Sequence, residues 1–177
     1  MRSEPDGAPA DADEAVAIAA ARGAAGDHIA AVAVLTTALS QHPRIAALWA
    51  FRARMWRLAG RADRAAEDLA RAVALDPADP YPAAQQSWIL WVLGRRPAAK
   101  ARLRRVARRH PEYHWAFAYL AQQHLVTGQL HAAQRAIERA LAIAPRCAYS
   151  LRIHADLLAN RGRHERALAI FDRVLVA

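Results

Sequence analysis

Glycine and proline alternate along this chain on a fixed period. Gly26, Gly60, Gly94, Gly128 and Gly162 recur at intervals of 34 residues, and Pro43, Pro77, Pro111 and Pro145 each follow a glycine by 17 residues. Both residue types interrupt helices, whereas the segments between them are rich in Ala, Leu and Arg, which favour helix. Each unit therefore predicts a helix, a turn at glycine, a second helix and a link that contains proline.

The period predicts five such units and no strand. The expected repeats cover residues 12–45, 46–79, 80–113, 114–147 and 148–177, all approximate bounds. We expect a single domain over residues 12–177, preceded by a flexible N-terminal segment, residues 1–11, rich in Pro, Gly, Ala and acids. Asp11 or Asp13 is the expected N-cap of the first helix, and Glu14 gives a capping-box pattern with Asp11.

Composition narrows the class of protein. Of the 177 residues 55% are hydrophobic, and these are largely Ala, which suits closely packed helices better than a large globular core. No segment approaches the roughly 20 apolar residues of a membrane span, and the acidic N-terminus lacks the apolar stretch of a secretory signal, so we expect a cytoplasmic protein. The single cysteine, Cys147, excludes an internal disulfide framework.

The residues around the glycines and prolines carry a family resemblance. The second unit has Trp49, Ala53, Trp56, Gly60, Ala65, Leu69, Ala72 and Pro77; the fourth has Phe117, Leu120, Ala121, Gly128, Ala133, Ile137, Ala140 and Pro145; the fifth has Leu151, Ala155, Leu158, Gly162, Ala167, Phe171 and Val174. This order of large and small residues resembles the tetratricopeptide repeat. The resemblance implies an all-α fold, a right-handed α-solenoid of five helix-turn-helix tetratricopeptide repeats.

Some positions depart from the family pattern. Arg52, Gln86 and His154 replace the usual leucine, Arg22 replaces an aromatic residue, and Ala15 and Ala83 replace a large residue. The first helices of repeats one and three are therefore poorly specified by the pattern. Trp88 and Trp91, beside the weak positions of repeat three, either turn inward and fill that volume or project outward.

The resemblance also implies a concave groove lined by the first helices. The expected groove residues are Phe51, Arg54, Arg57, Leu58, Tyr81, Gln85, Trp88, Trp91, Trp115, Tyr119, Gln122, Tyr149, Arg152 and Asp156. Aromatic rings anchor apolar side chains, and arginine contacts carboxylates or phosphates at two points. The leading hypothesis is a non-catalytic adaptor that binds a peptide or protein segment, of unknown identity, in this groove. The bland alternative is that several of these aromatics only complete the core. A clamp for chaperone tails is disfavoured, because its Lys and Asn positions are not matched.

Basic residues cluster in the third repeat. Net charge is +9, Lys100 is the only lysine among the 25 basic residues, and the Ala- and Arg-rich composition is of a bacterial type. No acidic residue lies between Pro80 and Pro111, which holds Arg95, Arg96 and the residues that we call the basic ridge: Lys100, Arg102, Arg104, Arg105, Arg108 and Arg109. Leu103, Val106 and Ala107 have the spacing of residues that pack inward. The ridge is then either a solvated outer face or, as an alternative function, a site on the helix 100–110 that binds nucleic acid or another polyanion. Nucleic acid is the less favoured partner, because no groove-reading motif accompanies the ridge.

Motifs for catalysis are absent from the sequence. It contains no HExxH, no Gly-rich phosphate loop and no G-x-S-x-G, so we expect no enzyme activity, no cofactor and no metal. His124 and His154 occupy core positions and are interpreted as packing residues. Glu67, Asp68, Glu138 and Glu165 are interpreted as solvent-facing partners in ion pairs. A weaker alternative is a regulatory or substrate-recruiting module of a separate enzyme.

The last helix of the fifth unit has no following helix in this sequence. Leu168, Leu175 and Val176 would then lack a neighbour. We expect either self-association through this helix or a longer protein that supplies the next helix.

Overall fold

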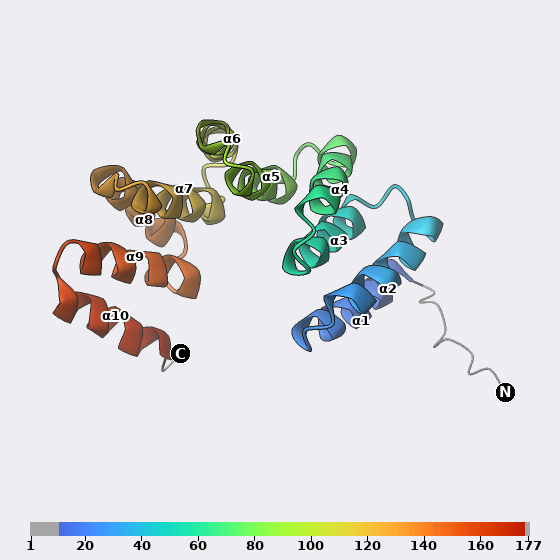
Figure 1. Cartoon of the computed structure of the whole chain (residues 1–177), viewed down its shortest axis with the longest axis horizontal. Coiled ribbons are helices and arrows are strands. Elements are labelled where there is room, and N and C mark those ends of the chain that lie inside the picture. The colour runs from blue at the N-terminus through green and yellow to red at the C-terminus, as the bar shows by residue number, and fades with distance from the viewer. Residues whose placement is uncertain (1–10, 176–177) are drawn as a thin grey trace. The chain divides into compact units, whose positions relative to one another are not determined.

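The computed structural model describes the backbone of residues 11–175 and the side chains of residues 11–172; within this range it contains ten α-helices and no strand (Figure 1). The helices are α1 (Ala12–Ala24), α2 (His28–Gln41), α3 (Ala46–Leu58), α4 (Ala62–Leu75), α5 (Pro80–Val92), α6 (Arg96–Arg109), α7 (His114–Val126), α8 (Leu130–Ile143), α9 (Ala148–Asn160) and α10 (His164–Leu175). Helices α5 and α6 have a proline in their first turn, Pro80 and Pro97. Of the segment expected to be flexible, residues 1–11, only Asp11 lies within the described residues. Val176 lies outside them.

Short polar side chains begin several helices. The Asp11 carboxylate accepts a hydrogen bond from the Asp13 amide, which confirms Asp11 as the N-cap of α1. Asp27 caps α2 through the Ala30 amide at 3.0 Å, and Asp79 caps α5 through the Tyr81 amide at 2.9 Å. These bonds satisfy amides that have no partner inside the helix. Pro80 at the start of α5 loses no hydrogen bond for the same reason.

The periodic glycines end the first helix of each pair. All five adopt positive φ, from 70° at Gly128 to 84° at Gly26, a conformation that costs an L side chain about 1–2 kcal/mol. At Gly128 the glycine amide bonds the Leu125 carbonyl and the Gln129 amide bonds the His124 carbonyl at 2.9 Å. This pair of bonds satisfies the last carbonyls of α7 and reverses the chain direction.

The chain divides into two compact units, Met1–Leu93 and Gly94–Ala177. In the described part of the first unit, neighbouring helices pack in chain order, and α1 also contacts α3. Two clusters form its core: one holds Leu35, Leu48 and Met55 among alanines of α1 and α2, and the other holds Ala53, Ala65, Leu69 and Ile89. Alanine at Ala53 and Ala65 lets the helices approach closely, as the repeat pattern predicts.

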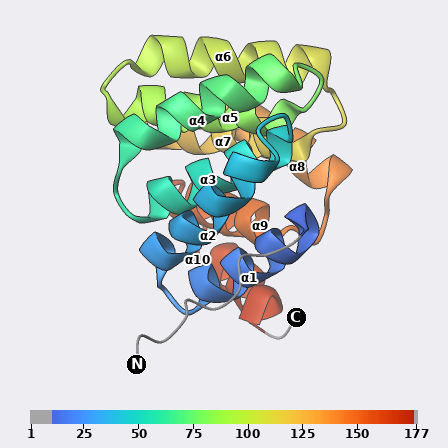
Figure 2. The same cartoon turned by 90° about the vertical axis from the view of Figure 1, so that its right-hand side faces the viewer.

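The second unit uses the same plan. Helices α6 to α10 pack in chain order, and α7 and α9 also contact each other directly. Figure 2 shows α9 and α10 as neighbours, as they also are in Figure 1. Ile137, Ile153 and Leu157 are buried between small residues, among them Ala121 and Ala133. Among the described helices, none combines the length and the hydrophobicity that a membrane crossing requires.

Candidate interaction surfaces

Three aromatic rings of the second unit pack together on the first helices of two consecutive repeats. Trp115 and Tyr119 lie one turn apart on α7, and Tyr149 lies in the first turn of α9. The ring centroid of Trp115 is 5.8 Å from that of Tyr119 and 5.5 Å from that of Tyr149, and the two tyrosine rings meet edge to face at 5.6 Å. These separations are typical of favourable aromatic pairs. We call Trp115, Tyr119 and Tyr149 the aromatic cluster; all three are half-buried.

Polar side chains surround the aromatic cluster. The Tyr149 hydroxyl donates to the Gln122 amide oxygen. The Arg152 guanidinium lies over the Tyr149 ring, 5.2 Å from its centroid, and its Nη1 atom pairs with Asp156 Oδ2 at 2.9 Å. The structure thus brings together the six groove residues that the sequence predicts for this unit. It leaves all six partly open to solvent.

The sequence did not single out His114 for this surface. Its ring stacks on Trp115 with centroids 4.8 Å apart, and its buried Nδ1 atom has no hydrogen-bond partner. Burial lowers the pKa of His114, so its imidazole is neutral at pH 7. The only feature of the sequence that could have indicated His114 was its position beside Trp115, at the first residue of the helix.

The predicted residues of the first unit lie on α3 and α5. Arg54 lies 5.8 Å from the Phe51 ring centroid and Arg57 lies 5.4 Å from that of Trp88. A crevice beside them is lined by Ala53, Arg54, Arg57, Ala65, Leu69, Gln85 and Ile89. Within the described part of the chain, neither arginine forms an ion pair, and the buried Nε atom of Arg57 has no partner.

Trp88 combines the two roles that the sequence left open. One side of it packs against the core cluster of Ala53, Leu69 and Ile89, and Arg57 lies over its ring. Tyr81 and Trp91 are half-buried on the same helix, and Leu58 at the end of α3 is exposed. The tryptophan therefore completes the core at the edge of the surface where the two arginines lie.

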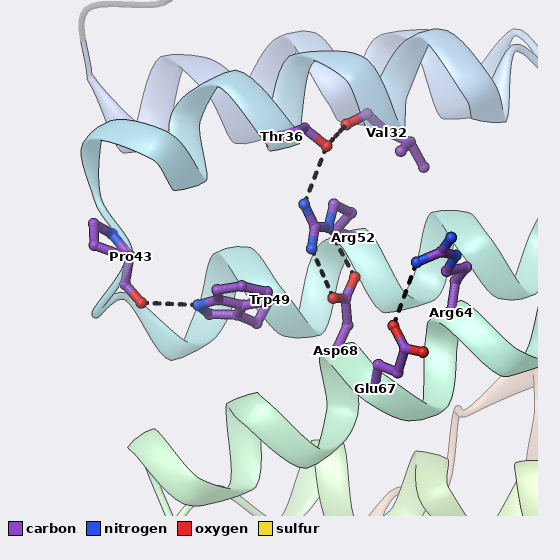
Figure 3. Close-up of polar contacts among 8 residues, drawn as sticks. All are labelled: Val32, Thr36, Pro43, Trp49, Arg52, Arg64, Glu67 and Asp68. Carbon is purple, nitrogen blue, oxygen red and sulfur yellow. Dashed lines mark hydrogen bonds and ion pairs between the residues drawn. The ribbon is translucent and has the colours of Figure 1, made fainter.

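Asp68 is not the solvent-facing residue that its place on a second helix indicated. Its side chain is only 5% exposed, and both of its oxygens accept hydrogen bonds from Arg52, at 2.7 and 2.8 Å (Figure 3). Arg52 also donates to the Thr36 hydroxyl at 3.1 Å and covers the Trp49 ring at 4.9 Å. Arginine in a leucine position thus requires a buried counter-charge, which Asp68 supplies. By contrast, Glu67 is exposed and pairs with Arg64 at 3.6 Å, as expected.

The basic ridge is less uniform than the sequence indicated. Arg104, Arg105, Arg108 and Arg109 are exposed, whereas Lys100 and Arg102 are half-buried. The Lys100 ammonium turns to the α7–α8 turn and donates to Thr127 Oγ1 at 2.9 Å and Gln129 Oε1 at 3.1 Å. Leu103, Val106 and Ala107 are buried, as the helical spacing predicts.

The histidines expected in core positions are enclosed to different degrees. His124 is buried and its Nδ1 atom lies 2.6 Å from Gln129 Oε1, while His154 is half-buried. Burial lowers the pKa of both, and a hydrogen bond to Gln129 partly opposes this for His124, as Glu138 does for His154. In the described residues no cluster of His, Cys, Asp or Glu has the arrangement of a metal site.

Paired helices joined at glycines, with aromatic and guanidinium groups spread over helix faces, define an α-helical repeat protein that presents interaction surfaces. Residues 16–80 and 119–177 match the family model of the tetratricopeptide repeat, and the chain belongs to this family. Its members are all-α helical repeat solenoids that serve in general as non-catalytic scaffolds for protein interactions. The stretch between the two matches, 81–118, is most of the irregular third repeat.

Solved structures share this fold. A thermophilic tetratricopeptide repeat protein of Thermus thermophilus is 21% identical, with a TM-score of 0.83 over 92% of this chain and 89% of that one. PilF of Pseudomonas aeruginosa is 21% identical, with a TM-score of 0.73 over 92% and 74%. MamA of Desulfovibrio magneticus is 15% identical, with a TM-score of 0.64 over 96% of both chains. No curated protein sequence matches this chain.

Proposed function

We propose that this chain is a non-catalytic adaptor that binds a peptide or protein segment on the aromatic cluster of α7 and α9. The observation that supports this most is the arrangement of Trp115, Tyr119 and Tyr149, whose rings lie within 5.8 Å of one another and remain half-buried. Rigid aromatic rings supply a large contact area with little loss of side-chain freedom, and they dominate measured binding energies at protein interfaces.

The polar groups beside the cluster indicate the chemistry of the segment. An apolar or aromatic side chain of the partner would contact the rings, while Arg152 and Asp156 would offer one cation and one anion at the edge. In the first unit, Arg54 and Arg57 offer two guanidinium groups with no carboxylate partner among the described residues. A partner with an apolar anchor and nearby acidic residues therefore suits both units, each taken by itself.

Peptides selected from a random phage-displayed library against the intact chain test this proposal. We expect that Trp115→Ala combined with Tyr149→Ala weakens binding of the selected peptides at least 30-fold, the effect of losing about 2 kcal/mol at a hot spot. Tyr113→Ala is the matched control, because it removes a half-buried tyrosine outside the cluster. Unchanged affinity in the double variant, with an unchanged circular dichroism spectrum, would show that the binding surface lies elsewhere.

A further inference from the structure

The two units of this chain differ sharply in charge. Residues 1–93 carry 9 basic and 11 acidic side chains, a net charge of −2, whereas residues 94–177 carry 16 basic and 5 acidic side chains, a net charge of +11. Half of the basic residues of the second unit lie in the 15 residues from Arg95 to Arg109. A helical repeat that only bound a peptide on its aromatic cluster would not need this concentration of one sign of charge.

The exposed arginines of α6 form two parallel rows. Arg104 and Arg108 lie one turn apart, as do Arg105 and Arg109, and these four side chains make no ion pair within the described part of the chain. The opposite side of α6 is closed by Ala99, Leu103, Val106 and Ala107, which are buried. From Arg104 to Arg109 the helix presents exposed cations over about 7–8 Å.

Burial and positive charge together lower the pKa of two further side chains of this unit, Lys100 and His124. Lys100 is held by two neutral oxygens, those of Thr127 and Gln129, and no carboxylate of the described residues pairs with it. Burial, with the nearby charges of Arg104 and Arg96, lowers the pKa of Lys100. Besides burial, the charges of Lys100, Arg104 and Arg135 lower the pKa of His124. Lys100 is half-buried and His124 is buried, so the exposed cations of α6 are its arginines.

We propose that the exposed arginine rows of α6 bind the phosphate backbone of duplex nucleic acid without reading its sequence. Arginine contacts a phosphate at two points, and cations spread along one helix match a polymer of regularly spaced charges. This function is additional to peptide binding and uses different residues from the aromatic cluster.

Other polyanions fit these rows less well. Along α6 the exposed side chains are arginine, alanine and proline, with no aromatic or large apolar residue. A protein interface has an apolar or aromatic centre, a membrane-binding helix presents an apolar face, and a site for single strands stacks bases on aromatic rings. Contacts to duplex phosphates need none of these.

Salt dependence gives a quantitative test with the intact chain and a short, mixed-sequence DNA duplex, followed by fluorescence anisotropy. Four phosphate contacts predict a log–log slope of about −3.6, so affinity should fall about 150-fold between about 50 and 200 mM salt. Arg104→Gln combined with Arg108→Gln should make the slope less steep by about 1.8. Arg44→Gln with Arg71→Gln is the matched control, because it removes the same charge from exposed arginines of the first unit and should leave the slope unchanged.

Several results would overturn this assignment. One is the absence of DNA binding at about 50 mM salt, a concentration at which contacts to phosphates are strong. Another is an equal change of slope in the Arg104/Arg108 double variant and in the Arg44/Arg71 control. Tighter binding of poly-glutamate, or of vesicles with anionic lipids, than of DNA at the same ionic strength would assign the rows to an acidic protein or a membrane instead. Trp115→Ala with Tyr149→Ala should keep DNA binding, so failure of the peptide proposal and failure of this one are distinguishable.

Discussion

Replacing Arg52 by leucine, the residue usual at this position in the family, should destabilise the protein. The substitution leaves the Asp68 carboxylate, 5% exposed, without its partner. Removing one member of a buried ion pair costs about 3–5 kcal/mol, because the remaining charge is neither paired nor hydrated. The lost hydrogen bond to Thr36 adds about 1 kcal/mol, and the leucine side chain recovers part of the total by apolar burial. We expect a net loss of about 3–4 kcal/mol.

The double substitution Arg52→Leu with Asp68→Leu should restore most of this stability. Apolar residues of similar volume replace buried ion pairs at little cost and sometimes stabilise by about 1–4 kcal/mol. The unchanged protein, the variants Arg52→Leu and Asp68→Leu, and the double variant form a double-mutant cycle. They can be compared by urea denaturation followed by circular dichroism. With a slope of about 2 kcal/mol per molar urea, the Arg52→Leu midpoint should fall by about 1.5–2 M. A fall of less than about 0.5 M, or a double variant no more stable than Arg52→Leu, would refute the reasoning.

Three further predictions concern local features. Gly128→Ala should cost about 1–2 kcal/mol in urea denaturation, because φ is 70° there, and Gly128→Asn should cost less. Asp27→Ala should lower the free energy of unfolding by about 1 kcal/mol through loss of the α2 cap, which a thermal melt would show as a shift of about 2–4 °C. Folding lowers the pKa values of His114, His124 and His154, so below about pH 6.5 the unfolded chain binds more protons than the folded chain. The unfolding midpoint should therefore decrease as the pH is lowered from about 7.5 to about 5.0. Replacing all three by glutamine should flatten that dependence; an unchanged slope would contradict it.

The sequence predicted the helices because their ends depend on local backbone conformation. Gly128 ends α7 at a positive φ that its own lack of a side chain permits, and Pro80 begins α5 where its missing amide costs nothing. The positions of buried alanines such as Ala65 also follow from the repeat, because the distance between two helices is set by the small residues where they cross. Each of these features can be read within one 34-residue unit.

The pairing of polar residues between helices could not be read in the same way. Arg52 and Asp68 are 16 residues apart, on different helices, and neither residue by itself indicates a buried ion pair. In the sequence Lys100 resembles its neighbours on the ridge, but its ammonium donates to Thr127, which lies 27 residues further along the chain. The contact between Trp115 and Tyr149 follows more directly from the repeat, since the two residues are 34 positions apart on successive first helices.

The glycine turns are also positions where chemical synthesis could introduce D-amino acids. At all five glycines a Cβ atom would meet no other atom within 4 Å, while φ lies on the positive side. What these turns reject in alanine is therefore its handedness and not its volume. A mirror-image alanine prefers the φ that each turn already has, so peptide synthesis could place a D-residue between the two helices of every repeat, stiffening the unfolded chain without disturbing a packed side chain.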